Sequence, residues 1–172
     1  MKTSKFGLGL HKVSSLTLAA ALSSLCTAAL AQATVEVTKS ACAFVGANSN
    51  EPAGDRDGHV IQVVNYSCKV QGGGLDGAIT TGQAAWDHEG LNATAAYNVG
   101  VVRKPGGLAV FSLLEGRRTL IMKEGKVVGY TSSGSSKFTT ATGTLSSYSG
   151  KSFSWTVTPA SAFEFVIDTK TN

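Results

Sequence analysis

Helical periodicity, catalytic motifs and strong charge are the features that this sequence has least of. After the first thirty-one residues, no window of ten or more residues places apolar residues at the 3.6-residue spacing of an amphipathic helix. The chain has no C-x-x-C pair and no G-x-S-x-G elbow, and the glycines at 72–74 precede no helix that could cradle a phosphate. These absences argue against a helical fold, a thiol redox centre and an ordinary esterase.

The first thirty-one residues have the pattern of a secretory signal peptide. Residues 1–12 carry three lysines and no acidic residue, and residues 13–30 form an uncharged apolar stretch interrupted by Ser and Thr. Residues 29–31 (Ala-Leu-Ala) match the small-x-small pattern before a cleavage site. We expect cleavage after Ala31, a periplasmic or secreted mature chain of residues 32–172, and no membrane span.

The charge of the mature chain is close to zero. All eleven acidic residues lie after position 31, whereas three of the fifteen basic residues leave with the signal. The basic residues that remain are scattered, with Arg103-Lys104 and Arg117-Arg118 as the only adjacent pairs, and a solvated face is the expected place for each. The charge therefore gives no support for a nucleic-acid partner.

Two cysteines, Cys42 and Cys68, remain after cleavage, because Cys26 lies in the signal segment. In an oxidising compartment two cysteines most simply form one disulfide. A metal or redox pair is the alternative, but neither His59 nor His88 stands at a usual zinc spacing from these cysteines. The sequence thus predicts a disulfide, no metal site and no cofactor.

Short β-forming runs separated by Gly, Asn, Asp and Ser make up the mature chain. Polar residues at 46–58 predict a loop, and Ser, Thr and Gly dominate 131–150. High glycine with little proline suits a strongly curved sheet. We therefore predict an all-β fold, a single antiparallel barrel of about eight strands, with a β-sandwich as the alternative. The expected strands are 34–39, 59–70, 78–88, 93–103, 108–116, 119–123, 126–130, 151–158 and 162–169.

The second half of the chain, residues 92–158, resembles the allene oxide cyclase-like barrel group, which includes the dirigent proteins. The resemblance rests on GGLAVFSLLEG at 106–116, on ATGT at 141–144 and on YSGK at 148–151. It implies an eight-stranded antiparallel barrel around a mostly apolar cavity that binds a hydrophobic small molecule. It also implies that some members steer a cyclisation without a cofactor.

Two polar residues are candidates for proton transfer. His88 shares the alternating face of Trp86 at a strand end, where it could act as a general base, and a solvent-exposed strand end is the alternative. Glu115 is expected on the face of Ala109 and Phe111, where desolvation would raise its pKa; a rim carboxylate paired with a neighbouring arginine is the alternative. Aromatic residues are the candidates for lining a ligand pocket, or for simple core packing: Trp86, Tyr97, Phe111, Tyr130 and Trp155.

Three functions are compatible with these patterns. The first is an exported barrel that binds a hydrophobic small molecule without turnover. The second is a cofactor-independent cyclase or isomerase that uses His88 and Glu115 in one shared pocket. The third is a structural or surface-interaction protein without a ligand, which a large exposed apolar patch would indicate.

Overall fold

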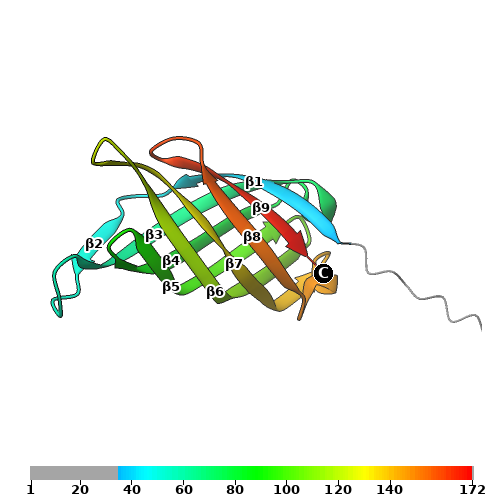
Figure 1. The fold of residues 1–172 in the computed structure, drawn as a ribbon. Helices are drawn as coiled ribbons and strands as arrows, with labels where there is room; N and C mark the ends of the chain where they lie inside the picture. The colour runs from blue at the N-terminus through cyan, green and yellow to red at the C-terminus, as the bar shows by residue number, and fades with distance from the viewer. Residues whose placement is uncertain (1–34, 172) are drawn as a thin grey trace, which may run out of the picture. The chain divides into compact units, whose positions relative to one another are not determined.

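The structure, a computed structural model, describes residues 35–171 and is a closed antiparallel β-barrel (Figure 1). The predicted signal segment, residues 1–31, lies outside the described residues. The barrel prediction is confirmed, and the sandwich alternative is excluded. Within the described part of the chain the strands are β1 Glu36–Phe44, β2 Ser49–Pro52, β3 His59–Gln71, β4 Ile79–Glu89, β5 Asn92–Lys104, β6 Gly107–Lys123, β7 Lys126–Gly143, β8 Ser152–Pro159 and β9 Glu164–Thr171.

Eight strands close the barrel and one extends it. From β3 to β9 each strand pairs with the next along the chain, and β1 pairs with both β9 and β3. The short strand β2 pairs with the first part of β3, beyond the part that β1 covers. Closure removes the free edges that an open sheet would expose to other chains.

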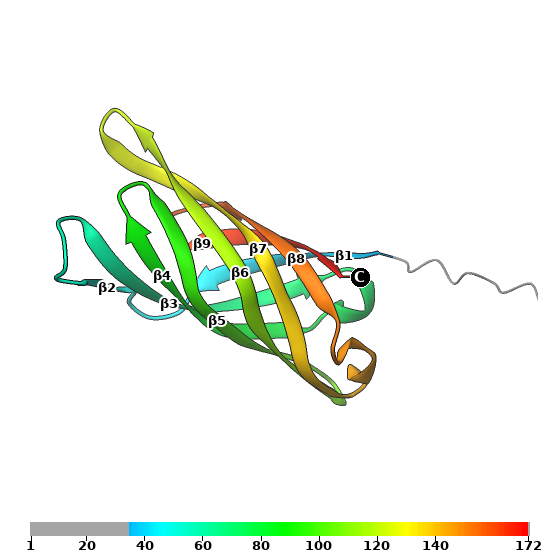
Figure 2. The same ribbon diagram turned by 60° about the horizontal axis from the view of Figure 1, so that its bottom comes forward.

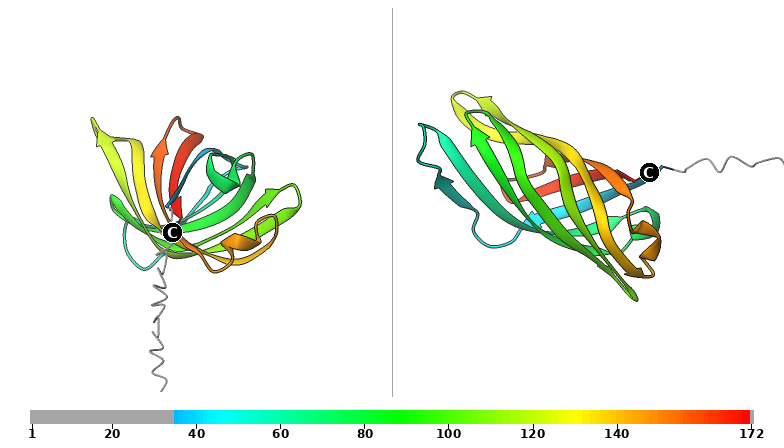
Figure 3. Two further views of the ribbon diagram at one scale, coloured as in Figure 1. Left: turned by 90° about the vertical axis from the view of Figure 1, so that its right-hand side faces the viewer. Right: turned by 90° about the horizontal axis from the view of Figure 1, so that it is seen from below.

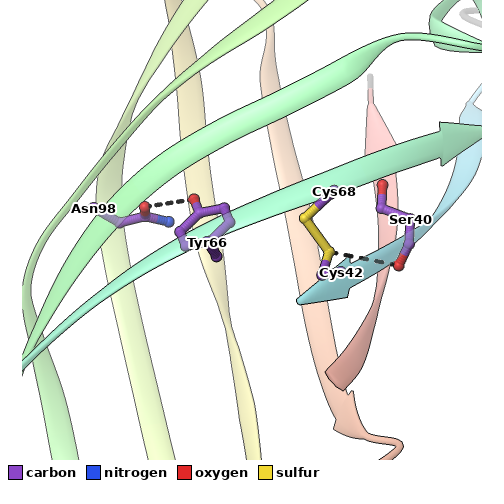
Figure 4. The surroundings of a disulfide bond; sticks show 5 residues. All are labelled: Ser40, Cys42, Tyr66, Cys68 and Asn98. Atoms are coloured by element: carbon purple, nitrogen blue, oxygen red, sulfur yellow. Dashed lines mark hydrogen bonds between the residues drawn. A yellow bond between two sulfur atoms is a disulfide. The ribbon is translucent and has the colours of Figure 1, made fainter. Parts of the chain in front are cut away.

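A disulfide fastens the seam at which the barrel closes. Cys42 of β1 lies directly opposite Cys68 of β3, and their sulfur atoms are bonded (Figure 4). The predicted pairing is therefore present. A disulfide is compatible with an oxidising compartment.

One end of the barrel is plugged by two short 3-10 helices, η1 Gly73–Leu75 and η2 Ser146–Tyr148. Leu145 is completely buried beside η2, and the Tyr148 hydroxyl donates to the Glu36 carboxylate at 2.7 Å. The backbone N–H of η1 at position 74 donates to the same carboxylate at 2.5 Å. These contacts tie both helices to β1, and Figure 3 (left) views the barrel from this plugged end.

The opposite end, called the open end below, carries the β4–β5, β6–β7 and β8–β9 turns. The β6–β7 hairpin turns at Glu124 and Gly125, between the runs expected at 119–123 and 126–130, and both residues have the positive φ of a tight hairpin turn. The tip of the β6–β7 hairpin projects beyond its neighbours (Figure 2), with Val127 and Val128 more than half exposed. Within residues 35–171 no helix is long and apolar enough to span a membrane.

Strand boundaries differ from the prediction in four places. The runs expected at 108–116 and 119–123 form the single strand β6, and the strand expected at 34–39 continues as β1 up to Phe44. The polar loop at 46–58 contains β2, and the Ser- and Thr-rich region after position 130 continues as β7 up to Gly143. Inward positions on β7 are small: Ser132 accepts a hydrogen bond from Arg118, and Ser136 accepts one from the indole of Trp155. Their β structure comes from backbone pairing with both neighbours and not from strand propensity.

Candidate functional site

The interior of the barrel contains a cavity of about 100 Å³. Its wall is mostly apolar, with a few polar groups placed along it. Such a wall is typical of sites for small organic ligands, although pockets for drug-sized ligands are about three to ten times larger. The aromatic residues that line the cavity are Phe44, Tyr66, Trp86, Phe111, Tyr130, Phe138, Phe153, Trp155 and Phe165.

Two glycines create the space for the indole of Trp155. Gly134 pairs with Trp155 on one side and with Gly116 on the other. A Cβ atom at Gly134 would lie 2.5 Å from the Trp155 ring, and one at Gly116 would lie 3.1 Å from it. The indole N–H donates to Ser136 at 3.1 Å. Trp155 is thus fixed across the middle of the barrel.

Phenylalanine rings fill the half of the barrel toward the plugged end. Phe111 meets Phe153 edge to face with centroids 5.6 Å apart, and Phe138 lies 4.7 Å from Phe153 and 5.4 Å from Tyr148. These separations are in the range of favourable aromatic pairs. The deep end of the cavity is therefore a rigid apolar floor.

Arg118 of β6 is buried on the inner wall toward the open end, with only 7% of its surface exposed. Its guanidinium carbon lies 4.0 Å from the ring centre of Trp86 and 4.5 Å from that of Tyr130. Nε donates to Ser132 at 3.1 Å, and one terminal nitrogen donates to Gln62 at 2.7 Å. Neutral groups therefore hold this cation in place.

No carboxylate of residues 35–171 forms an ion pair with Arg118. Burial lowers the pKa of Arg118 to about 10, while the hydroxyl of Tyr130 opposes the shift. Burial also lowers the pKa of His88, and the positive charge of Arg118 adds to this effect. Arg118 is thus a buried positive charge on the cavity wall, whereas His88 is not among the residues that line the cavity.

Two buried nitrogen atoms in this region have no hydrogen-bond partner among the described residues. They are Nε1 of Trp86, whose side chain lines the cavity, and Nε2 of His88 on the same strand. Buried polar groups are paired in the great majority of cases. The unpaired indole nitrogen of Trp86, in a ring that lies 4.0 Å from the guanidinium carbon of Arg118, makes this part of the wall a candidate ligand site.

Four of the five predicted ligand-binding aromatics line the cavity, namely Trp86, Phe111, Tyr130 and Trp155. Tyr97 does not, because it is 39% exposed on the outer wall and donates to Gln83 at 2.7 Å. Its face is set by an irregularity in the β4–β5 register, where one extra β5 residue stands between the partners of Ala85 and Trp86.

His88 and Glu115 are not brought together. His88 lies on the inner face of β4 and is half-buried, whereas Glu115 is exposed and borders a groove on the outer wall. A bulge at Leu114 reverses the alternation of β6, so that Phe111 and Arg118 face inward and Glu115 outward. A proton-transfer pair in one shared pocket therefore has no support from this geometry.

Further polar groups close the cavity wall on β3. Tyr66 is buried and donates from its hydroxyl to Asn98 at 2.8 Å (Figure 4), and burial raises its pKa.

Sequence reasoning missed Arg118, Gln62 and Ser132 as site residues. In the described part of the chain, no group of three or more His, Cys, Asp or Glu residues is arranged to hold a metal ion.

Comparison with protein-family models, with curated proteins and with solved structures finds no match to this chain. The resemblance to the allene oxide cyclase-like group therefore stays a prediction.

A separate charged cluster lies outside the cavity at the open end. His59 contacts Asp87 through Nε2 at 2.7 Å and Asp55 through Nδ1. Arg56 pairs with Asp55 at 2.6 Å and with Glu89 at 3.2 Å. The bond to Asp55, followed by the bond to Asp87, raises the pKa of His59, and the bond to His59 lowers the pKa of Asp55. The cluster thus links the β2–β3 loop to β4 while the imidazole is charged.

Stability is expected to fall as pH rises through the raised pKa of His59. A group with a raised pKa contributes fully below its unfolded value, about 6.5 for histidine, and loses that contribution on deprotonation. Thermal unfolding between about pH 6 and about pH 9 should show this loss in the wild type and not in His59→Gln. The pKa of His88 is lowered instead, so the effect of His88 on stability occurs at acidic pH, outside this range. Equal slopes for both proteins would contradict the assignment.

Proposed function

We propose that this protein is an exported β-barrel that binds a small apolar molecule inside the barrel. The observation that carries the proposal is the cavity of about 100 Å³, lined by rings and aliphatic side chains. An apolar ligand placed there would leave water and gain contacts with the surrounding rings. The floor of phenylalanine rings is fixed before binding, which lowers the entropic cost of association.

The volume of the cavity limits the size of the ligand. A cavity of roughly 150 Å³ lined by apolar side chains binds benzene or xenon in another protein. We therefore expect a ligand about the size of a single aromatic ring or a short hydrocarbon chain within the barrel. A larger molecule would have to extend through the open end.

Two observations support export. Residues 1–31 have the charge, apolar stretch and small residues of a secretory signal. The disulfide between Cys42 and Cys68 is compatible with folding in an oxidising compartment.

Filling the cavity is expected to abolish ligand binding. Ala84 is buried and lines the cavity, so leucine at this position would occupy the space that a single-ring ligand needs. Toluene binding, measured by the chemical shifts of the phenylalanine rings in NMR spectra, should be weakened at least about tenfold in Ala84→Leu. Ala43→Leu on the exposed face of β1 is the matched control and should bind as the wild type does.

A second measurement identifies the natural ligand. Protein expressed with its own signal segment is denatured, and the released small molecules are analysed by mass spectrometry. A stoichiometric apolar compound supports the proposal. An empty protein that also fails to bind toluene would contradict it.

A further inference from the structure

We propose that the barrel's ligand carries a carboxylate, which Arg118 and the indole N–H of Trp86 bind on the inner wall toward the open end. The inference rests on the proposed function and specifies its ligand class, a small apolar acid. It follows from an unpaired buried cation, an unpartnered buried donor beside it, and an apolar floor deeper in the same cavity.

Arg118 has N–H donors that no residue of the barrel uses. A guanidinium has five N–H groups, and the hydrogen bonds to Ser132 and Gln62 use two of them. Burying a charge without a counter-charge is costly. Contacts with two aromatic rings offset part of that cost. An anion that accepts from the remaining N–H groups would supply the missing counter-charge.

Trp86 supplies a second donor without a partner. The indole Nε1–H can only donate, and this atom is buried without a partner in a side chain that is 4% exposed. Its ring also lies 4.0 Å from the guanidinium carbon of Arg118. One acceptor group on a ligand can therefore satisfy both residues.

The inner face of β6 defines the direction in which a ligand would lie. Inward residues on β6 run from Arg118 at the open half, past Gly116 and the Trp155 ring, to Phe111 in the apolar floor. The inner wall thus changes from charged to apolar along β6, and a ligand with one charged end matches it in one direction only. Its apolar part lies against the phenylalanine rings, and its charged group lies toward the open end.

The geometry of Arg118 favours a carboxylate as the charged group of the ligand. Arg118 is held by two rings and two hydrogen bonds, so its planar fork is oriented before a ligand arrives. A planar fork matches a carboxylate through two parallel hydrogen bonds. Carboxylate is also a small anionic group, which suits a cavity of about 100 Å³.

The test compares benzoate with toluene, which has the same ring but no charge. We expect the wild type to bind both by calorimetric titration, and benzoate more tightly. Arg118→Met keeps the volume of the side chain and removes the charge. It should lower the ratio of benzoate affinity to toluene affinity about tenfold or more, a ratio that a change in cavity shape alone would move much less. Arg117→Gln, on the exposed face of the same strand, is the matched control and should leave both affinities unchanged.

A second variant addresses the indole donor. Trp86→Phe retains an aromatic ring and removes Nε1–H, so it should lower the ratio of benzoate affinity to toluene affinity by about fivefold. It also tests the inference if Arg118→Met does not fold. Toluene binding without tighter benzoate binding would overturn the inference and leave the proposed function standing. Binding of neither probe by the folded wild type would overturn both.

Discussion

Replacing Gly134 by alanine is expected to lower the free energy of unfolding by about 3 kcal/mol. The new Cβ would lie 2.2 Å from the backbone oxygen of Glu115 and 2.5 Å from the ring of Trp155. A backbone carbonyl in the middle of a paired strand cannot move aside as a flexible side chain can. Either the β6–β7 pairing or the position of the indole must therefore change.

Gly129→Ala provides the matched control on the same strand. The nearest atoms to a Cβ at Gly129 belong to Pro159 and Ile121, at 3.5 Å and 3.9 Å, which are ordinary contacts. Urea unfolding followed by tryptophan fluorescence would give both free energies. A loss below about 1 kcal/mol for Gly134→Ala, or equal losses for the two variants, would contradict the packing argument.

The general fold could be predicted from the sequence, because period-two alternation and glycine-rich turns are typical of a curved antiparallel sheet. The runs at 59–70 and 93–103 correspond closely to β3 and β5. By contrast, β7 was underestimated because its inward serines have low strand propensity. The glycine between them, Gly134, leaves room for Trp155, which belongs to a strand that comes later in the chain. Only tertiary packing supplies that reason.

The orientation of individual side chains was less accessible, because alternation breaks at each bulge. The bulge at Leu114 turns Glu115 outward and Arg118 inward, and the irregularity between Ala85 and Trp86 turns Tyr97 outward. A single extra residue reverses every later side chain on a strand. No residue type marks these two positions in the sequence.

Arg118 shows the consequence for the candidate site. Adjacent basic residues usually lie on a solvated face, and Arg117 does so. Arg118 is instead buried, against the sequence expectation, because it alternates with Gly116 and Leu120 on the inner face of β6. Those small and apolar neighbours at two-residue spacing were the available signal. The acceptors that hold its charge come from β3 and β7, and no local pattern could identify them.

Removing the disulfide is expected to lower the free energy of unfolding by about 3.5 kcal/mol. The bond closes a loop of 26 residues, and chain entropy in the unfolded state predicts this magnitude for a loop of that length. Its place in the fold adds to its importance, since Cys42 and Cys68 join the two strands whose pairing closes the barrel. Both side chains are buried, and Cys68 lines the cavity.

The double variant with Cys42→Ala and Cys68→Ala tests this expectation without leaving a free thiol. Reduced wild-type protein is the control, because it retains both sulfur atoms and lacks only the bond. If the bond itself stabilises the fold, the two proteins lose similar free energies in urea unfolding. A loss confined to the alanine variant would assign the effect to side-chain packing in the barrel wall. Because the remaining β1–β3 pairing still closes the barrel, we expect both proteins to stay folded at room temperature and to bind toluene with reduced affinity.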